Sequence, residues 1–304
     1  MTNELPVFDL IIVGAGPAGI TAAVYAARKK IDFMVVTTDI GGQAAMASMI
    51  EDYTGFQYIT SEDLADKFEN HREKYSFKLK KEEVIRVQKK HGLFSVKTTG
   101  NTYPGETVLI ATGRKPKELN VPGESELKGR GLTYCATCDA PLYEGLDVAV
   151  VGGGESGLEA ALQLTKIADK IHIIDSEPQL KVGEAIAEKI KSSDKVKIWA
   201  SAEVREIQGD NTVTGVKIEK EGKETLLPVQ GVFIEIGSVA NSSMVDFVEK
   251  NREGEIMVDY RCETNIPGLF AAGDVTNVPH KQIVVAAGEG CKASLSAFSY
   301  LSKK

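Results

Sequence analysis

Two cysteines three positions apart are the strongest chemical signal in the sequence. Cys135 and Cys138 form a Cys-x-x-Cys motif, and Asp139 follows directly. If the pair opens a helical turn, its sulfur atoms can bridge and the helix N-terminus stabilises a thiolate. Thiol–disulfide exchange also needs a proton donor when a thiolate leaves, and Asp139 can supply it. The motif predicts a redox-active disulfide, with a helix cap as the structural alternative for Asp139.

The remaining cysteines and the histidines do not suggest a metal site. Cys262 and Cys291 are isolated, and free cysteine is commonly buried, so we assign both to packing. A zinc site would need a second pair of ligands at metal spacing, and the four histidines are scattered. A secreted disulfide scaffold would be smaller and denser in cysteine. We therefore expect no metal and a cytoplasmic protein.

A glycine-rich loop near the start predicts a dinucleotide site. Phe8 to Val13 is apolar and reads as a strand, and an alanine-rich helical stretch runs to Lys30 after the loop. The loop matches G-x-G-x-x-G, whose glycines allow a tight turn, close approach to a pyrophosphate and helix–strand packing. The pyrophosphate would lie at the helix N-terminus. The expected contacts are Gly14, Gly16, Pro17, Ala18 and Gly19.

The next strand is expected over residues 32–38 and completes a βαβ unit. Thr38 stands where a ribose-binding acid is commonest, and Asp39 comes one residue later. A threonine hydroxyl can still hydrogen-bond a ribose, so Thr38 is the candidate contact.

The same order of elements recurs in the middle of the chain. Residues 147–151 read as a strand, 158–168 as a helix and 170–174 as the next strand. Between the first two lies a second G-x-G-x-x-G loop. Its expected nucleotide contacts are Gly152, Gly154, Glu155, Ser156 and Gly157.

Asp175 predicts which nucleotide this second loop prefers. It lies 21 residues beyond Gly154, the usual place for a carboxylate that binds both ribose hydroxyls. Such a carboxylate repels a 2′-phosphate, which needs a cation such as arginine, and residues 176–181 contain no arginine. The pattern favours NADH over NADPH, with a solvated strand-end acid as the alternative interpretation.

Charge and hydropathy limit the possible partners. The formal net charge is −7, whereas a nucleic-acid binder normally shows a basic patch. The cluster formed by Lys78, Lys80 and Lys81 is typical of a solvated strand edge. The first residues carry an acid where a secretory leader is positive, and no apolar run is long enough to span a bilayer. We expect no nucleic-acid partner and no membrane segment.

The rest of the chain supplies two linkers and a closing helix. Residues 107–112 read as a strand, and 114–122 and 237–243 as polar linkers. Residues 268–274 end a strand at Asp274, and 282–301 read as a helix.

Two dinucleotide units with a Cys-x-x-Cys between them form a rare combination, and the sequence resembles the low-molecular-weight thioredoxin reductase family over nearly its whole length. The second half is most similar to the flavoprotein subunit of alkyl hydroperoxide reductase. That subunit carries an extra N-terminal redox domain, which we expect this chain to lack because it starts directly at the first unit. The stretches that carry the resemblance are 14–19, 41–43, 111–113, 135–139, 152–157, 261–265, 270–274, 281–282 and 288–298.

The resemblance implies an α/β fold with two Rossmann-like dinucleotide-binding domains, for FAD and NAD(P), the second inserted in the first. Residues 1–114 and 244–304 would form the FAD domain, and residues 115–243 the NAD(P) domain with the redox pair. A rotation between the domains would bring the flavin to each partner in turn. A homodimer is typical of the family.

The resemblance also implies roles for individual residues. Cys138 would face the flavin, Cys135 would attack the partner disulfide, and Asp139 would be the acid. Asp274 would contact the FAD ribityl region, and two glutamines would lie near the flavin. The further contacts, with these glutamines, are Gly42, Gln43, Ala111, Thr112, Gly113, Gly273, Lys281 and Gln282.

The resulting hypothesis is a flavoprotein disulfide reductase. Electrons would pass from NADH through FAD to Cys135–Cys138 and on to a thioredoxin- or glutaredoxin-like protein, with a peroxiredoxin as a further acceptor. NADPH-specific relatives carry an arginine-rich signature where this chain has residues 175–177 and Lys181, which supports NADH and admits ferredoxin as donor. The intact second loop argues against ferredoxin. An NADH oxidase-like enzyme and a non-catalytic flavin redox sensor are two further hypotheses.

Overall fold

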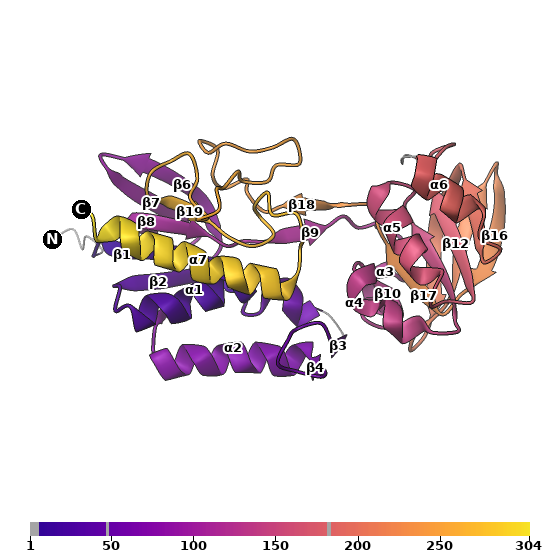
Figure 1. Cartoon of the computed structure of the whole chain (residues 1–304), viewed down its shortest axis with the longest axis horizontal. Coiled ribbons are helices and arrows are strands. Elements are labelled where there is room, and N and C mark those ends of the chain that lie inside the picture. Colours follow the sequence, from indigo (N-terminus) through magenta and orange to yellow (C-terminus); the bar gives the residue numbers. More distant parts are fainter. Residues whose placement is uncertain (1–5, 47–48, 181–183) are drawn as a thin grey trace. The chain divides into compact units, whose positions relative to one another are not determined.

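The computed structural model describes residues 6–46, 49–180 and 184–304. The chain divides into two compact units (Figure 1). Unit 1 gathers the described parts of 1–46, 53–115 and 239–304, and unit 2 those of 47–52 and 116–238. The predicted α/β class with two Rossmann-type units is confirmed, and each unit is built around its own sheet, which is mixed in unit 1 and parallel in unit 2.

Unit 1 contains a seven-stranded sheet in the order β5-β2-β1-β8-β7-β6, with β19 also paired to β8. The pairs among β5, β2, β1, β8 and β19 are parallel, whereas β6, β7 and β8 are antiparallel to one another in turn. The bounds are β1 Phe8–Val13, β2 Phe33–Thr37, β5 Lys78–Lys81, β6 Val84–Lys90, β7 Leu93–Thr98, β8 Thr102–Ile110 and β19 Leu269–Ala271.

The central strands of this sheet are apolar because both of their faces are covered. Every residue of β2 is buried, and only Asp9 of β1 is partly exposed. Parallel strands in such a position read as near-continuous apolar runs. The helices are α1 Pro17–Arg28, α2 Ser61–Tyr75 and α7 Ile283–Leu301, and α1 runs beside α7 (Figure 1). Gly290 allows that approach, since a Cβ there would overlap the Ala18 carbonyl oxygen.

Unit 2 contains a five-stranded parallel sheet in the order β10-β17-β11-β12-β13. Alternate residues of its strands point into two separate cores, as the twofold period of a strand requires. Helix α5 (Glu155–Leu164) packs on one face, and an antiparallel sheet covers the other. The strands are β10 Leu132–Thr133, β11 Asp147–Val151, β12 Lys170–Asp175, β13 Val196–Ala200, β14 Ala202–Gly209, β15 Val213–Lys220, β16 Lys223–Pro228 and β17 Gly231–Ile234.

The two predicted linkers contain short strands. β9 (Arg114–Pro116) pairs with β18 (Ser238–Ala240), so the connections are hydrogen-bonded to each other and are not irregular throughout. The prediction missed them because a three-residue strand has no readable periodicity. The remaining short elements are β3 Met49–Ile50, β4 Ile59–Thr60, α3 Glu124–Leu127, α4 Ala136–Asp139, α6 Glu184–Lys191 and the 3₁₀ turns Gly42–Met46 and Ala140–Tyr143.

Candidate active site

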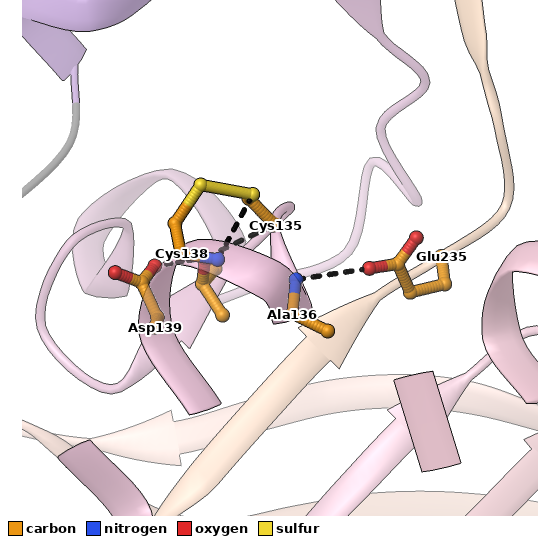
Figure 2. The surroundings of a disulfide bond; sticks show 6 residues. Cys135, Ala136, Cys138, Asp139 and Glu235 are labelled. Atoms are coloured by element: carbon orange, nitrogen blue, oxygen red, sulfur yellow. Dashed lines mark hydrogen bonds between the residues drawn. A yellow bond between two sulfur atoms is a disulfide. The ribbon is translucent and has the colours of Figure 1, made fainter. Parts of the chain in front are cut away.

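The cysteine pair forms a disulfide at the start of α4 (Figure 2). Cys135 is the N-cap of this one-turn helix, and the Cys138 backbone N–H donates to Cys135 Sγ at 3.3 Å. An N-cap has extended backbone and an acceptor side chain that satisfies a first-turn N–H group. Both cysteines are half-buried. The predicted disulfide is therefore present, and a first-turn backbone N–H group points at the Cys135 sulfur.

Asp139 is buried beside the disulfide (Figure 2). Its Oδ2 accepts a hydrogen bond from the Thr133 hydroxyl, whereas the buried Oδ1 has no partner among the described residues. Burial raises the pKa of the Asp139 carboxyl, and the Thr133 hydrogen bond opposes that rise. A carboxyl held partly in its protonated form can donate a proton at higher pH than an ordinary aspartate. The Asp139 side chain makes no helix-capping hydrogen bond in the described residues.

A buried glutamate fixes the segment that leads into the redox pair. Glu124 accepts hydrogen bonds from the backbone N–H groups of Leu119 and Asn120, and from the Tyr134 hydroxyl at 2.9 Å. The residue before Cys135 is thereby held in place. Sequence reasoning missed Glu124 because its partners lie in irregular backbone, where no spacing rule applies.

The second glycine loop follows β11 as predicted, and Gly154 is the N-cap of α5. The helix begins at Glu155, three residues before the predicted start. Gly152 and Gly157 are required by space: a Cβ at 152 would overlap the Glu235 carbonyl oxygen, and one at 157 the Gly152 carbonyl oxygen. The loop is thus packed as tightly as a pyrophosphate-binding turn needs.

Asp175 ends β12 beside this loop. Its Oδ1 accepts from the Glu177 backbone N–H at 3.2 Å, and its Oδ2 occupies the position that a Cβ at Gly153 would need. The carboxylate therefore lies against the glycine loop, where a ribose-binding acid is expected. Lys181, also noted in the sequence, lies outside the described residues.

Glu235 was not predicted and stands between the two motifs of unit 2. It follows β17, the strand between β10 and β11, and its Oε1 accepts from the Ala136 backbone N–H at 3.2 Å (Figure 2). Its backbone carbonyl accepts from the Ser156 hydroxyl at 3.3 Å. The sequence does carry a signal for it, since it is the polar residue that ends the apolar run 231–234, as Asp175 ends its own run.

The first glycine loop lies at the carboxyl edge of the unit 1 sheet. Val13 pairs with Ile110, and Ile110 pairs with Ala271, so three strands end side by side. Gly14 has φ +104°, and a Cβ there would overlap the Ala111 carbonyl oxygen. Gly42 lies close to the same loop, since a Cβ added at this position would be only 3.3 Å from Gly16 Cα. The predicted contacts Gly14, Gly16, Pro17, Ala18, Gly19, Gly42, Ala111, Thr112, Gly113 and Gly273 are gathered here.

Asp274 follows β19 at this edge. Its Oδ1 is buried and has no hydrogen-bond partner among the described residues, and burial raises the pKa of the carboxyl. An orphaned buried polar atom calls for a partner from outside the protein. A ligand hydroxyl, such as that of a ribityl chain, fits this atom, and the glycines around it leave room for close backbone approach. The residues of unit 1 therefore suit a dinucleotide such as FAD.

The Lys281 ammonium has two partners within unit 1. It bonds the Thr276 carbonyl at 2.6 Å and pairs with Glu255 at 2.8 Å, and Glu255 also pairs with Arg114. Thr38 donates to Asp39, whose other oxygen accepts from the Gly42 N–H. Gln43 is exposed and Gln282 is the N-cap of α7, and within the described ranges neither side chain has a hydrogen bond to the glycine loop.

Among the described residues, no group of three or more histidine, cysteine, aspartate and glutamate side chains is placed to hold a metal ion. None of the described helices is both long and apolar enough to cross a membrane.

The backbone conformation and close packing at Gly14 give a testable consequence. We expect Gly14→Ala to destabilise unit 1 by at least ~2 kcal/mol and to lower its flavin content, because φ is positive and the Cβ overlaps backbone. Gly55→Ala is the matched control, since Gly55 has φ +113° with nothing within 4 Å, and should cost only ~1 kcal/mol. Denaturant unfolding with flavin absorbance measures both. Equal losses in the two variants would show that the close approach at Gly14 is unimportant.

These features match one enzyme family. The sequence pattern of the family described as "Pyridine nucleotide-disulphide oxidoreductase" covers residues 8–290. The chain belongs to this family, and binding of a flavin and of a pyridine nucleotide follows from that membership.

Three individual proteins are similar to this chain over nearly all of its length. The chain is 40% identical to an NADH dehydrogenase of Bacillus subtilis and 38% identical to an alkyl hydroperoxide reductase subunit of Escherichia coli, over 97% and 98% of its length. It spans only 58% and 59% of those two proteins. Among solved structures, thioredoxin reductase from Streptococcus pyogenes superposes with a TM-score of 0.94 at 36% identity, covering 98% of this chain and 99% of that one. The predicted resemblance to low-molecular-weight thioredoxin reductases is confirmed.

Proposed function

We propose that this chain is a flavoprotein disulfide reductase that passes electrons from NADH through FAD to Cys135–Cys138, and then to a protein disulfide. The observation that carries the proposal is the half-buried disulfide at a helix start, beside a buried aspartate whose pKa is raised by burial. The full-length likeness to thioredoxin reductases supports it. FAD, when bound, would supply hydride acceptance and two-electron transfer to the disulfide.

The residues of the chain would carry the thiol chemistry. After reduction, the Cys135 thiolate attacks one sulfur of the partner disulfide, which breaks the partner's S–S bond and forms a mixed disulfide. The partner's other sulfur leaves with the bonding electron pair and takes a proton. Cys138 then attacks Cys135 Sγ, which releases the second partner thiol and re-forms Cys135–Cys138. Two electrons reach the partner, and Asp139 would deliver a proton when a thiolate leaves.

We assign one cofactor to each of the two dinucleotide-binding domains. Residues 1–114 and 244–304 would bind FAD, with Asp274 and the first glycine loop in contact with it. Residues 115–243 would bind the nicotinamide nucleotide at the second glycine loop. The predicted roles of Gln43, Gln282 and Lys281 in cofactor binding belong to this proposal.

NADH is the proposed donor because Asp175 lies against the second glycine loop. We expect NADH to bleach the flavin at least ~10-fold faster than NADPH in anaerobic stopped-flow experiments. Asp175→Asn should raise the NADH concentration needed for half-maximal bleaching ~10-fold, whereas Asp169→Asn, an exposed acid of the same unit, should not. Faster bleaching by NADPH would refute the Asp175 argument. If neither nucleotide bleaches the flavin, ferredoxin becomes the proposed donor. The chain is 30% identical to a ferredoxin-flavin thioredoxin reductase of Clostridium acetobutylicum.

The acceptor is proposed to be a thioredoxin- or glutaredoxin-like protein. The 38% identity to the Escherichia coli alkyl hydroperoxide reductase subunit favours a peroxiredoxin-linked acceptor as the second candidate. An assay of NADH consumption with and without a protein disulfide separates both from an NADH oxidase-like activity, which needs only oxygen. We further propose a homodimer and a cytoplasmic location, which size-exclusion chromatography and cell fractionation test.

A further inference from the structure

Three neighbouring strands of unit 2 lead to the redox pair, the second glycine loop and Glu235 at the same edge of the sheet. β10 leads to the redox pair, β11 leads to the second glycine loop, and β17 between them leads to Glu235. Thr133 pairs with Phe233, and Val151 pairs with Ile234, so the residues that follow these strands start from matched positions. The carboxyl edge of a parallel sheet is where such folds place their functional groups. Glu235 is thus placed by the strand order beside both motifs.

The contacts of Glu235 reach the backbone of the redox motif itself. Its Oε1 accepts from the Ala136 N–H at 3.2 Å, and Ala136 is joined to Cys135 by one peptide bond. Figure 2 shows the Glu235 carboxyl on the Cys135 side of α4 and Asp139 on the Cys138 side, so two carboxyls flank the disulfide. Asp139 was predicted from the motif, whereas Glu235 arrives from a distant strand, 99 positions from Ala136 along the chain.

The groups around Glu235 shift the pKa of its carboxyl in both directions. Burial raises the pKa of its carboxyl, the Ala136 N–H and the Ser156 hydroxyl lower it, and the carboxylate of Glu159 on α5 raises it further. Among the described residues, no basic side chain contributes to this pKa shift. Glu235 is therefore an acid whose pKa-shifting neighbours are neutral or acidic, and its hydrogen bond to Ala136 lies next to Cys135, the proposed attacking thiol.

We propose that Glu235 is a positioning residue for the redox pair: it holds the first turn of α4 through the Ala136 N–H and, when ionised, opposes formation of the Cys135 thiolate. The first-turn N–H groups of α4 favour a negative charge at Cys135, and the Cys138 N–H already points at its sulfur. A carboxylate hydrogen-bonded to that turn, as Glu235 is through the Ala136 N–H, acts in the other direction, because two neighbouring negative charges raise each other's pKa. Glu235 would thus keep the attacking thiol from becoming too acidic, and so preserve its nucleophilicity, which falls as a thiol pKa falls.

This inference rests on the proposed function only in taking Cys135 as the reactive thiol. It can be tested without nucleotide or partner, so its failure and a failure of reductase turnover are separate results. The probe is iodoacetamide, which reacts with the thiolate, applied to the reduced flavoprotein across a range of pH. Mass spectrometry of the Cys135 peptide gives its alkylation rate at each pH.

The isosteric variant Glu235→Gln keeps an acceptor for the Ala136 N–H and removes the charge. We expect its Cys135 thiol to titrate ~0.5–1 pH unit lower than in the wild type, giving several-fold faster alkylation at a pH below both thiol pKa values. Glu203→Gln, at an exposed position on β14, should leave the titration unchanged. Cys291 in the same samples serves as an internal reference. An unchanged thiol titration in Glu235→Gln would overturn the proposal.

A second variant tests the positioning half. Glu235→Ala removes both charge and acceptor, so the thiol should again titrate lower, and the amide hydrogens of α4 should exchange with solvent faster than in Glu235→Gln. Equal exchange rates in the two variants would show that the hydrogen bond from the Ala136 N–H to Glu235 does not stabilise the first turn of α4. In Glu235→Gln the acceptor for the Ala136 N–H is kept, so a lower thiol titration with unchanged amide exchange in that variant reports the lost charge and not a loss of structure.

Discussion

Replacing Cys135 by serine is expected to lower turnover with a protein disulfide by roughly 10³-fold or more, while NADH still bleaches the flavin at close to the normal rate. The hydroxyl has the size of the thiol and lacks its nucleophilicity at neutral pH, so the exchange step is lost and the flavin step remains. Steady-state NADH consumption with an oxidised thioredoxin, beside anaerobic stopped-flow bleaching, measures the two steps separately.

The two cysteines are also expected to behave differently from each other. Cys138→Ser retains the attacking thiol and loses the resolving one, so it should trap a mixed disulfide through Cys135 that intact-mass spectrometry detects. Cys291→Ser is the matched control, since Cys291 is a half-buried free cysteine outside the site, and it should turn over normally. Full activity of Cys135→Ser, or trapping by that variant in place of Cys138→Ser, would contradict the assigned roles.

Asp139→Asn is the second large effect and should lower turnover by roughly 10²-fold or more, because a positioned general acid contributes about that much. Since burial raises the pKa of Asp139, its protonated fraction falls as pH rises through that raised value, and the acid-dependent rate falls with it. Asparagine cannot titrate, so this alkaline limb of the pH profile should disappear. Asp210→Asn, in an exposed turn of the same unit, is the control. A variant that kept the alkaline limb would assign it to another group.

The same pKa shift also predicts how the Asp139→Asn substitution changes the free energy of unfolding at different pH values. A carboxyl whose folded-state pKa is raised contributes stability below its unfolded pKa of about 3.9, and loses that contribution as pH rises through the folded value. The free energy of unfolding of Asp139→Asn, relative to wild type, should therefore increase between acidic and neutral pH. A helix-capping aspartate would give the reverse, because removing a cap costs stability once the carboxylate is ionised. Urea unfolding at the two pH values distinguishes a carboxyl whose pKa is raised by burial from a helix-capping carboxylate.

The parts of this fold that follow local rules were predictable from the sequence. β1 and β11 have the predicted bounds because a buried parallel strand is a continuous apolar run that ends at a glycine. The disulfide was predictable because its two cysteines lie one helical turn apart. The position of Asp175 beside its glycine loop follows from the regular length of a βαβ unit.

The parts that depend on contacts between distant segments were not predictable. Glu235 meets Ala136 only because β17 inserts between β10 and β11 in the sheet, and strand order is not written in any local pattern. Glu124 was missed for the same reason, since it holds Tyr134 across irregular backbone. The ion pair between Lys281 and Glu255 likewise joins separate segments and has no local signal in the sequence.

The central claim is that the Cys135–Cys138 disulfide lies on the path of electrons from the nicotinamide nucleotide to a protein acceptor. Anaerobic titration of the flavoprotein with NADH tests it most directly, with free thiols counted by mass spectrometry at each point. We predict that full reduction takes about two molecules of NADH per flavin, one for the flavin and one for the disulfide, and that Cys138→Ser takes about one. Wild-type protein that is fully bleached by about one molecule of NADH, with Cys135–Cys138 still oxidised after further additions, would contradict the account.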